Sequence, residues 1–459
     1  MKKSLMILSL ILSANAFAGS IDYLAQQDAE YFAHPSMTGK IGVSSAFYNP
    51  AGTVFLEDGT YVQISTQTID KQYEMDTKLE GTDKLKHKSD HPSALVPSVQ
   101  IVKKEGNRAY FFHGGAAAGG GDVKYSNGIS AFEILGKGIE IGLREGSKIP
   151  TAEIKYLNGS QVYGSSYYFN TNFGMAQRIN NEFSVAGGIR LMYVTRKLEG
   201  VAHYNLNLAG EKLKPEMSKF ENVNVSIDSE RTGYGVGGFV GFNYQPNEKL
   251  NIGFKYETEI ELHLNADGEV RTKNSNGMPI SGNKDIDKGI LEGINNSLKQ
   301  APVISEWLVN DRRNLPAVMS LGAAYQATDR LTLLTSGNYY FIKDANRNGV
   351  YENYDNGYEV SIGLDYKLND QFTFMTGYQY TKTGANEKTY KDTDYALDAD
   401  MYGVGLKYTP DDSKEFVISY AYVDYKNGTS VPTYGFKGKE NTTFKKTVQA
   451  VSLSAAFKF

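Results

Sequence analysis

The chain has 459 residues, a net charge of −4, no cysteine, 33 tyrosines and one tryptophan. The lack of cysteine excludes disulfide-stapled folds and thiol-based metal or nucleophile chemistry, and the mild acidity without a basic block gives no indication of a nucleic-acid partner. Abundant glycine and aromatic residues, without long apolar runs, fit a transmembrane β-barrel, whose hydropathy signal is weak.

Residues 1–18 have the features of an export signal peptide. Lys2 and Lys3 precede a mostly apolar run over residues 5–12, and Ala16-Phe17-Ala18 is a typical cleavage site. The run is too short to span a bilayer, and no stretch of about 20 apolar residues follows it. We therefore expect an exported chain without a transmembrane helix.

Residues 19–59 lack the alternation of a β-strand. Within them, Asn49-Pro50-Ala51-Gly52 predicts a turn, because Pro50 has no N–H to donate and Gly52 tolerates a positive φ. We interpret residues 19–59 as a hatch that plugs a barrel. The four turn residues taken alone favour an ordinary turn in a periplasmic extension.

Fourteen segments of period-two alternation, bounded by turn residues, predict the strands of an antiparallel transmembrane β-barrel over residues 60–459. They are residues 60–70, 93–103, 108–122, 161–179, 182–198, 231–245, 249–263, 315–327, 330–343, 357–369, 371–383, 395–409, 415–427 and 447–459. Short and long connections alternate, and the long ones include 199–230 and 264–314. Short periplasmic turns and long external loops are typical of outer-membrane barrels, so both termini are expected on the periplasmic side. A soluble β-sandwich rarely holds this many strands.

The alternation also predicts which side chains face the lipid and which face the lumen. In residues 250–262 the apolar face carries Leu250, Ile252, Phe254, Tyr256, Ile260 and Leu262. The polar face carries Asn251, Lys255, Glu257, Glu259 and Glu261. Apolar-out and polar-in suits a wall around a polar lumen. The last strand ends in Phe459, which looks like the C-terminal signal read by the outer-membrane assembly machinery.

Several motifs resemble, in order, those of the FadL family of outer-membrane transporters of hydrophobic compounds. Tyr48-Asn49-Pro50-Ala51-Gly52 resembles the family's hatch, and Asn314-Leu315-Pro316-Ala317 resembles its Leu-Pro strand start. Tyr402-Gly403-Val404-Gly405 and the final phenylalanine add to the likeness. The resemblance implies a fourteen-stranded barrel with an N-terminal hatch, and passive uptake of long-chain fatty acids or other hydrophobic molecules.

One candidate ligand site is an amphipathic helix over residues 285–298. Its apolar stripe consists of Ile286, Ile290, Ile294 and Leu298, and the single tryptophan, Trp307, follows it. The stripe fits either packing against a neighbouring loop or a surface groove that captures an apolar ligand. The resemblance implies such a groove between the third and fourth external loops, residues 199–230 and 264–314.

Two arginines are candidates for holding a ligand carboxylate. Arg190 and Arg196 fall on the lumen-facing side of residues 182–198, and a carboxylate in an apolar pocket needs a cation to offset its desolvation. The alternative, which the residues favour, is a lumen arginine paired with the hatch or with one of three acidic residues, Glu257, Glu259 or Glu261.

The third strand contains a glycine-rich run, His113 to Gly121. Its glycines are Gly114, Gly115, Gly119, Gly120 and Gly121. Glycine inside a strand often marks a bulge or bend, and small side chains leave room for a lateral opening to the membrane. The resemblance also implies a kinked third strand. The alternative is a wall of small residues against which the hatch packs closely.

The expected partners are a hydrophobic small molecule such as a fatty acid, outer-membrane lipid and the assembly machinery, with the chain acting as a monomer. We expect no cofactor, metal site or nucleic-acid partner, and no enzyme activity, because the residues offer no recognisable catalytic set. Two other functions fit a barrel: a general porin or a surface adhesin. A hatch would argue against an open porin.

Overall fold

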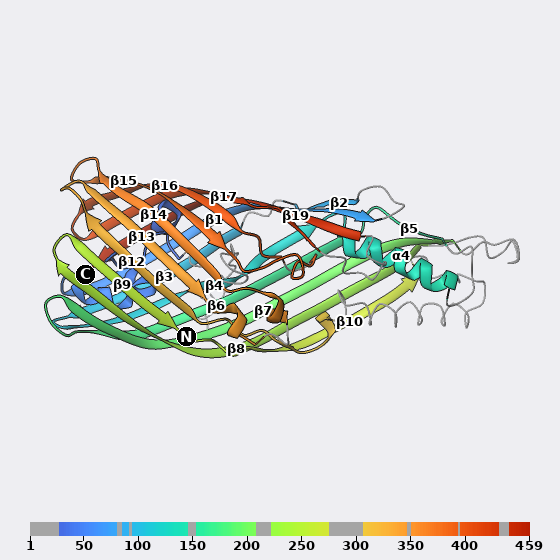
Figure 1. Ribbon diagram of the computed structural model, residues 1–459, viewed down its shortest axis with the longest axis horizontal. Helices are drawn as coiled ribbons and strands as arrows, with labels where there is room; N and C mark the ends of the chain where they lie inside the picture. Colours follow the sequence, from blue (N-terminus) through green and yellow to red (C-terminus); the bar gives the residue numbers. More distant parts are fainter. Residues whose placement is uncertain are drawn as a thin grey trace, which may run out of the picture.

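The computed structural model describes residues 27–79, 85–90, 94–145, 153–207, 222–274, 306–346, 350–392, 395–430 and 440–459. Fourteen of the described strands form a closed antiparallel barrel (Figure 1). They are β1 (Gly59–Leu79), β3 (Ala94–Glu105), β4 (Arg108–Tyr125), β6 (Gln161–Arg178), β7 (Phe183–Asn207), β8 (Asn222–Asn247), β9 (Leu250–Glu257), β12 (Val318–Gln326), β13 (Leu331–Tyr340), β14 (Gly357–Lys367), β15 (Phe372–Lys382), β16 (Ala399–Asp411), β17 (Lys414–Tyr425) and β19 (Glu440–Lys458). Strands β1 and β19 close the barrel with a register that runs from Tyr61–Lys458 to Leu79–Glu440. The predicted fourteen-stranded barrel is confirmed.

Short strands and helices extend the wall at one end. The strands are β2 (Leu85–Lys88), β5 (Glu153–Tyr156), β10 (His263–Asn274), β11 (Asp311–Arg312) and β18 (Gly428–Thr429). The helices are α4 (Ser130–Glu145) and three 3-10 turns, η3 (Glu306–Leu308), η4 (Ile342–Asp344) and η5 (Val350–Asn353). In Figure 1, β5, β10 and α4 lie beyond the main barrel on the right. The sequence prediction ended its third strand at residue 122 and began its fourth at residue 161, so it missed both α4 and β5.

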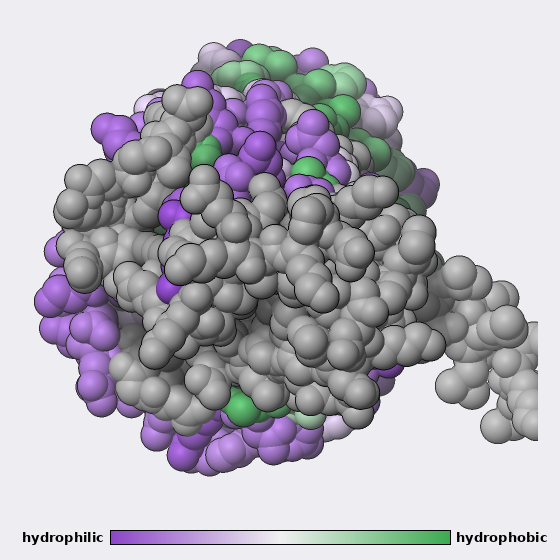
Figure 2. Space-filling view, turned by 90° about the vertical axis from the view of Figure 1, so that its right-hand side faces the viewer, coloured by the Kyte–Doolittle hydropathy of each residue, from purple (hydrophilic) through white to green (hydrophobic). Residues whose placement is uncertain are grey.

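The two ends of the barrel differ in the length of their connections. Short turns, such as residues 106–107 and 248–249, join strands at the end where the C-terminus lies. Because short turns face the periplasm in outer-membrane barrels, we call this end periplasmic and the opposite end external. Figure 2, which faces the external end, shows mainly hydrophilic residues around the rim and a hydrophobic group along its upper right edge. Within the described ranges, no helix has the length and apolar composition needed to cross a membrane.

The wall is apolar outside and largely polar inside, as predicted. In β19, Val451 and Leu453 are exposed on the outer face, while Ser452 and Ser454 are buried on the inner face. The outward side chains therefore match the hydrocarbon of a bilayer, and the inward ones surround a lumen.

The predicted lipid-facing positions of Ile260 and Leu262 are wrong. Both side chains are completely buried. Strand β9 ends at Glu257, and the chain then follows the inner side of β8, where it meets Gly235 and Gly237. The break between β9 and β10 shifts the alternation by one residue, which turns the apolar side chains inward.

The described part of the N-terminal segment, residues 27–56, is folded inside the barrel. It consists of α2 (Ala29–Ala33), α3 (Ser45–Tyr48) and the 3-10 helix η1 (Pro50–Phe55). Helix α2 contacts β15, β16, β17 and β19, while η1 contacts β4 and β6 to β9, so the segment spans the lumen. The close approach requires glycine in the wall: a Cβ on Gly403 would lie 2.1 Å from the carbonyl oxygen of Phe32. The predicted signal peptide lies outside the described residues.

Candidate functional site

The ladder between β3 and β4 stops partway along both strands. Pairing runs from Glu105–Arg108 to Val99–Gly114 and goes no further within the described residues. Beyond that point β3 pairs with β1 and β4 pairs with β6. The β4–β6 register shifts twice between Ala116 and Gly121, and Gly121 has φ +64°. The glycine run thus coincides with an irregular strand, and we call residues 94–98 of β3 and 115–125 of β4 the β3–β4 seam.

Gln27 lies inside the barrel at this seam and bonds to both strands. Its side-chain nitrogen donates to the carbonyl oxygen of Ala116 at 2.7 Å, and its side-chain oxygen lies 3.0 Å from Nε2 of His113. Its main-chain carbonyl accepts hydrogen bonds from the side chains of Ser98 and Gln100 in β3. One residue of the N-terminal segment therefore bridges the two strands where their own ladder has ended.

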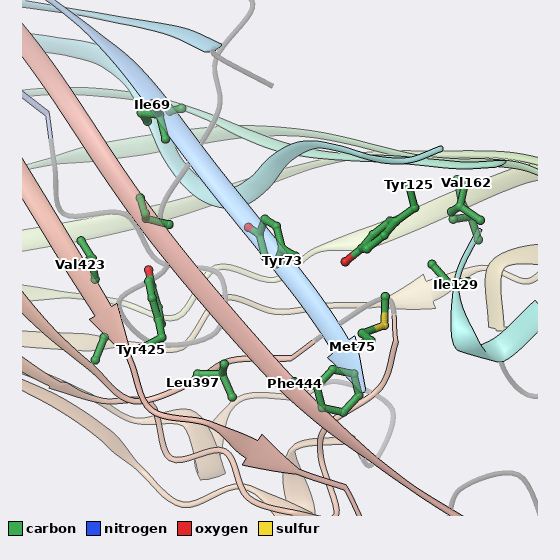
Figure 3. Close-up of a cluster of buried hydrophobic side chains, with 14 of the residues drawn as sticks. Ile69, Tyr73, Met75, Tyr125, Ile129, Val162, Leu397, Val423, Tyr425 and Phe444 are labelled. Atoms are coloured by element: carbon green, nitrogen blue, oxygen red, sulfur yellow. The ribbon is translucent and has the colours of Figure 1, made fainter. Parts of the chain in front are cut away.

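The lumen on the external side of this segment is lined with apolar and aromatic side chains. They come from strands all around the barrel and form one buried cluster. Figure 3 shows Tyr73 of β1, Tyr125 of β4 and Tyr425 of β17 projecting into the same region, with Met75 and Phe444 beside them. This cluster gives the external half of the lumen an apolar surface suited to hydrophobic molecules.

The Asn49-Pro50-Ala51-Gly52 motif fixes the N-terminal segment to the wall. It forms the first turn of η1, where Pro50 occupies a position that needs no N–H donor. Oδ1 of Asn49 accepts a hydrogen bond from the N–H of Gly52 at 3.2 Å. Nδ2 of Asn49 donates to Oδ1 of Asn243 in β8 at 2.7 Å. The predicted turn is therefore present as a buried, wall-anchored 3-10 turn.

Ion pairs fix the opposite side of the segment. Nζ of Lys40 lies 2.7 Å from Oε2 of Glu30 and 2.6 Å from Oδ2 of Asp365 in β14. Lys407 of β16 also pairs with Glu30, and Nε2 of His34 lies 2.8 Å from Oδ1 of Asp365. Burial disfavours the charged form of Glu30, but Lys40 and Lys407 outweigh it and hold the pKa of Glu30 below its ordinary range. The buried carboxylates are thus compensated by cations from both the segment and the wall.

Arg190 is buried in the lumen and paired with an acidic residue. Its side chain is 1% exposed, and its Nε lies 3.4 Å from Oε1 of Glu257. Nζ of Lys255 lies 3.3 Å from the same oxygen. The structure thus has the pairing that the sequence offered as the alternative to a ligand contact.

Arg196 is placed differently, against the only tryptophan. The guanidinium carbons of Arg196 and Arg231 each lie 5.0 Å from the ring centroid of Trp307, which is buried. Nε of Arg196 donates to the side chain of Ser166 at 3.2 Å. These cation–π contacts hold η3 against the inner face of β7 and β8.

The structure gives little information on the other site residues predicted from the sequence. Ile286, Ile290, Ile294 and Leu298 lie outside the described residues. Phe459 is 79% exposed at the periplasmic end. Among the described side chains, no group of three or more His, Asp or Glu is arranged to hold a metal ion.

Comparison with known proteins identifies the family. Residues 161–459 match the model of a family described as outer membrane protein transport protein, with OMPP1, FadL and TodX as its named members. The chain belongs to this family. The resemblance inferred from the motifs is thereby confirmed, and the protein is a multi-pass barrel of the outer membrane. The comparison with curated proteins gives no match.

Solved structures of the FadL/TodX family share the fold. A Pseudomonas aeruginosa FadL homologue has 16% sequence identity and a TM-score of 0.66, with 96% of this chain and 100% of that chain covered. The P. putida toluene transporter TodX has 12% identity and a TM-score of 0.62, covering 95% and 99%. The Ralstonia pickettii toluene transporter TbuX has 14% identity and a TM-score of 0.55, also covering 95% and 99%. At these identities the likeness establishes the fold alone.

Membership of this family makes the protein an outer-membrane transport protein. Sequence reasoning located the glycine run of β4 but missed Gln27, which carries the contacts across the seam. No local pattern marks Gln27, because its partners in β3 and β4 are between 71 and 89 residues away in the chain.

Proposed function

We propose that this member of the FadL/TodX family takes up long-chain fatty acids or other hydrophobic small molecules by passive passage through the lumen, acting as a monomer. The molecule leaves sideways through the β3–β4 seam into the bilayer. The observation that carries the proposal is the ladder between β3 and β4, which stops at Val99–Gly114 beside an apolar lumen.

A sideways exit agrees with the energetics of the ligand. Each CH₂ group transferred from water to an apolar medium gains about 0.8 kcal/mol. A long acyl chain therefore gains far more by entering hydrocarbon than by entering the aqueous periplasm. At the seam the ladder between the two strands is missing, and Gln27 forms hydrogen bonds to both of them there. Displacing this one residue opens the lumen to the membrane.

Residues 19–59 act as a hatch in this proposal. The described part closes the periplasmic side of the lumen, with α2 and η1 in contact with opposite sides of the wall. A shift of the hatch moves Gln27, so hatch movement and opening of the seam are coupled. The packing and ion pairs of the hatch argue against the general porin considered above.

Capture from outside is assigned to the external loops 199–230 and 264–314. Their described parts line a partly open hollow of about 240 Å³ with a mixed lining, in which Val201 and Ile227 are apolar and Glu199, Asp228, Glu269 and Arg271 are charged. The apolar stripe of residues 285–298 would complete the groove, and Arg196 beside Trp307 marks the inner end of these loops. Arg190, which is already paired, has a structural role in this account.

Uptake into proteoliposomes tests the proposed function. Vesicles with the purified protein in their membrane should take up a fluorescent long-chain fatty acid faster than protein-free vesicles, while sucrose stays outside. Exclusion of sucrose is expected because the hatch blocks an aqueous path. Entry of sucrose at porin-like rates would contradict the proposal and support a general porin. Equal initial rates of fatty-acid uptake with and without protein would also contradict it.

A further inference from the structure

Helix α4 lies over the external part of the lumen, beyond the main barrel (Figure 1). Its first turn places Ala131 and Phe132 in the apolar cluster, together with the preceding Ile129, which Figure 3 shows near Met75. The hydroxyl of Tyr204 in β7 donates a hydrogen bond to the carbonyl oxygen of Phe132 at 2.6 Å. Further contacts of α4 come from β1, β2 and β5. The helix therefore covers the cluster on its external side.

Two side chains from other parts of the chain hold the first turn of α4. Oδ2 of Asp392, in the connection between β15 and β16, accepts a hydrogen bond from the N–H of Ala131 at 2.6 Å. Nε2 of His87 in β2 lies 3.3 Å from Oε2 of Glu133. Between β7 and β16 stand β8, β9 and β12 to β15 in one direction around the barrel, and β17, β19, β1, β3, β4 and β6 in the other. Tyr204 and Asp392 thus fix this turn between opposite sides of the external mouth.

The sequence of this turn holds a second set of caps that the structure leaves unused. Ser130-Ala131-Phe132-Glu133 has the Ser-x-x-Glu pattern of a capping box, in which the two side chains bond to each other's main-chain N–H groups. Here the hydroxyl of Ser130 is buried and has no hydrogen-bond partner among the described residues, while the carboxylate of Glu133 faces His87. A buried hydroxyl without a partner is uncommon and calls for an explanation.

We propose that α4 is a lid over the external mouth, and that its first turn exchanges one pair of caps for the other when the lid opens. In the closed state, which the structure shows, Asp392 and His87 hold the turn. In the open state Ser130 and Glu133 cap the helix by themselves, so the first-turn N–H groups stay bonded. Gly128, whose φ is +72°, precedes the helix and gives the chain a place to turn.

The transported molecule itself can drive this exchange. With the lid closed, Ile129 and Phe132 cover apolar surface that would otherwise meet water. An apolar molecule that enters the lumen covers the same surface, so its binding favours the open state over the closed one. In this respect the inference rests on the proposed function, which supplies such a molecule.

Labelling of a cysteine beneath the lid tests the inference without any transported molecule. The reporter variant A202C introduces the only thiol into the chain. Ala202 is completely buried in β7 between Gly200, where a Cβ would lie 2.9 Å from the ring of Phe132, and Tyr204. Opening of α4 exposes this position to the external medium. The probe is a membrane-impermeant sulfonated maleimide added to cells that produce the full-length protein, and mass spectrometry of the purified protein gives the labelling rate.

Removing a closed-state contact should speed the labelling of A202C. D392A deletes the acceptor of the first-turn hydrogen bond, and loss of a helix cap shifts a two-state equilibrium about twofold to thirtyfold. E133Q weakens the contact with His87 but keeps a side chain that suits a capping box, so it should also label faster. E133Q serves as the test if D392A fails to fold by circular dichroism.

Removing the unused serine should have the opposite effect. S130A deletes a cap that only the open state uses, so labelling should slow by a factor of about two or more, both alone and in combination with D392A. A helix that merely frays when it loses contacts would not label more slowly after this change. The matched control is S126A, which removes a hydroxyl bonded to Asp90 just before the helix and should label at the parent rate.

Two results would overturn the inference. One is labelling at the parent rate in both D392A and E133Q, and the other is labelling of S130A as fast as the parent or faster. In both cases the proposed function would stand, because uptake into proteoliposomes measures transport directly. A wild-type protein without uptake would remove the proposed function and leave the labelling results in place.

Discussion

A disulfide across the β3–β4 seam should stop uptake of hydrophobic molecules. The double variant S98C/G115C places cysteines on the two strands, where an ideal Cβ on Gly115 lies 3.2 Å from Cβ of Ser98. This separation is slightly shorter than usual for a disulfide, and a small strand movement allows the bond. Because the chain has no cysteine of its own, the bond can form only at this place. We expect fatty-acid uptake by the oxidised protein to fall by about tenfold or more, as the exit is closed.

The reduced form of the same protein is the first control. It carries the same side chains, including the cysteine that displaces Oε1 of Gln27, so recovery of uptake with a reductant isolates the effect of the bond. The matched pair S419C/S452C joins register partners in β17 and β19, which are already laddered. Oxidation of S419C/S452C should leave fatty-acid uptake unchanged. Equal uptake by oxidised and reduced S98C/G115C would place the exit elsewhere.

Removal of the hatch should convert the closed barrel into an open channel. Deleting residues 20–58 removes α2, α3 and η1 from the lumen and leaves all barrel strands intact. We expect a large, steady conductance in planar bilayers and higher sensitivity of cells to antibiotics, because wide barrels without a plug leave an aqueous channel. The intact protein should show little conductance under the same conditions.

A point variant supports the deletion experiment. In G403V the new side chain cannot fit, since even a Cβ would lie 2.1 Å from the carbonyl oxygen of Phe32. The valine side chain should displace α2 and raise the conductance to a level between those of the intact protein and the deletion protein. G337V is the matched control, because a Cβ there makes an ordinary contact of 3.5 Å with the backbone of Glu359.

A folded deletion protein with wild-type conductance would show that residues 20–58 do not plug the barrel.

Most of the wall could be predicted from the sequence. Each of the fourteen predicted segments overlaps a barrel strand, because a wall with lipid on one side and a lumen on the other imposes a strict period of two. The strand ends were predicted less well. For example, β7 continues to Asn207 and β8 begins at Asn222, beyond the bilayer, where no lipid enforces the alternation.

The errors of the sequence-based prediction have identifiable physical causes. Helix α4 contains Gly136, Gly138 and Gly142, and glycine lowers helix propensity by about 1 kcal/mol per residue, which hides the helical pattern. Ile260 and Leu262 turn inward because β9 ends early, and this depends on contact with inward glycines of β8 rather than on the local sequence.

The candidate site was only partly predictable. The glycine run of β4 indicated an irregular strand, which the structure confirms by the register shifts after Ala116. The contacts of Gln27 across the seam depend on residues far away in the chain, so a sequence pattern cannot reveal them. The ion pair of Arg190 with Glu257 likewise required the registers of β7, β8 and β9.

The lateral exit is tested most directly by locating a ligand during transport. A fatty acid with a photoreactive diazirine at its terminal carbon is added to cells that produce the protein, and labelled residues are found by mass spectrometry after illumination. Passage through the seam predicts labels on Val96 of β3 and Ala116 of β4, whose buried side chains lie in the apolar cluster at the seam. Labels on Val43 and Leu56, which line the periplasmic pocket beside the hatch, with none at the seam, would contradict the lateral exit and indicate a path through the hatch.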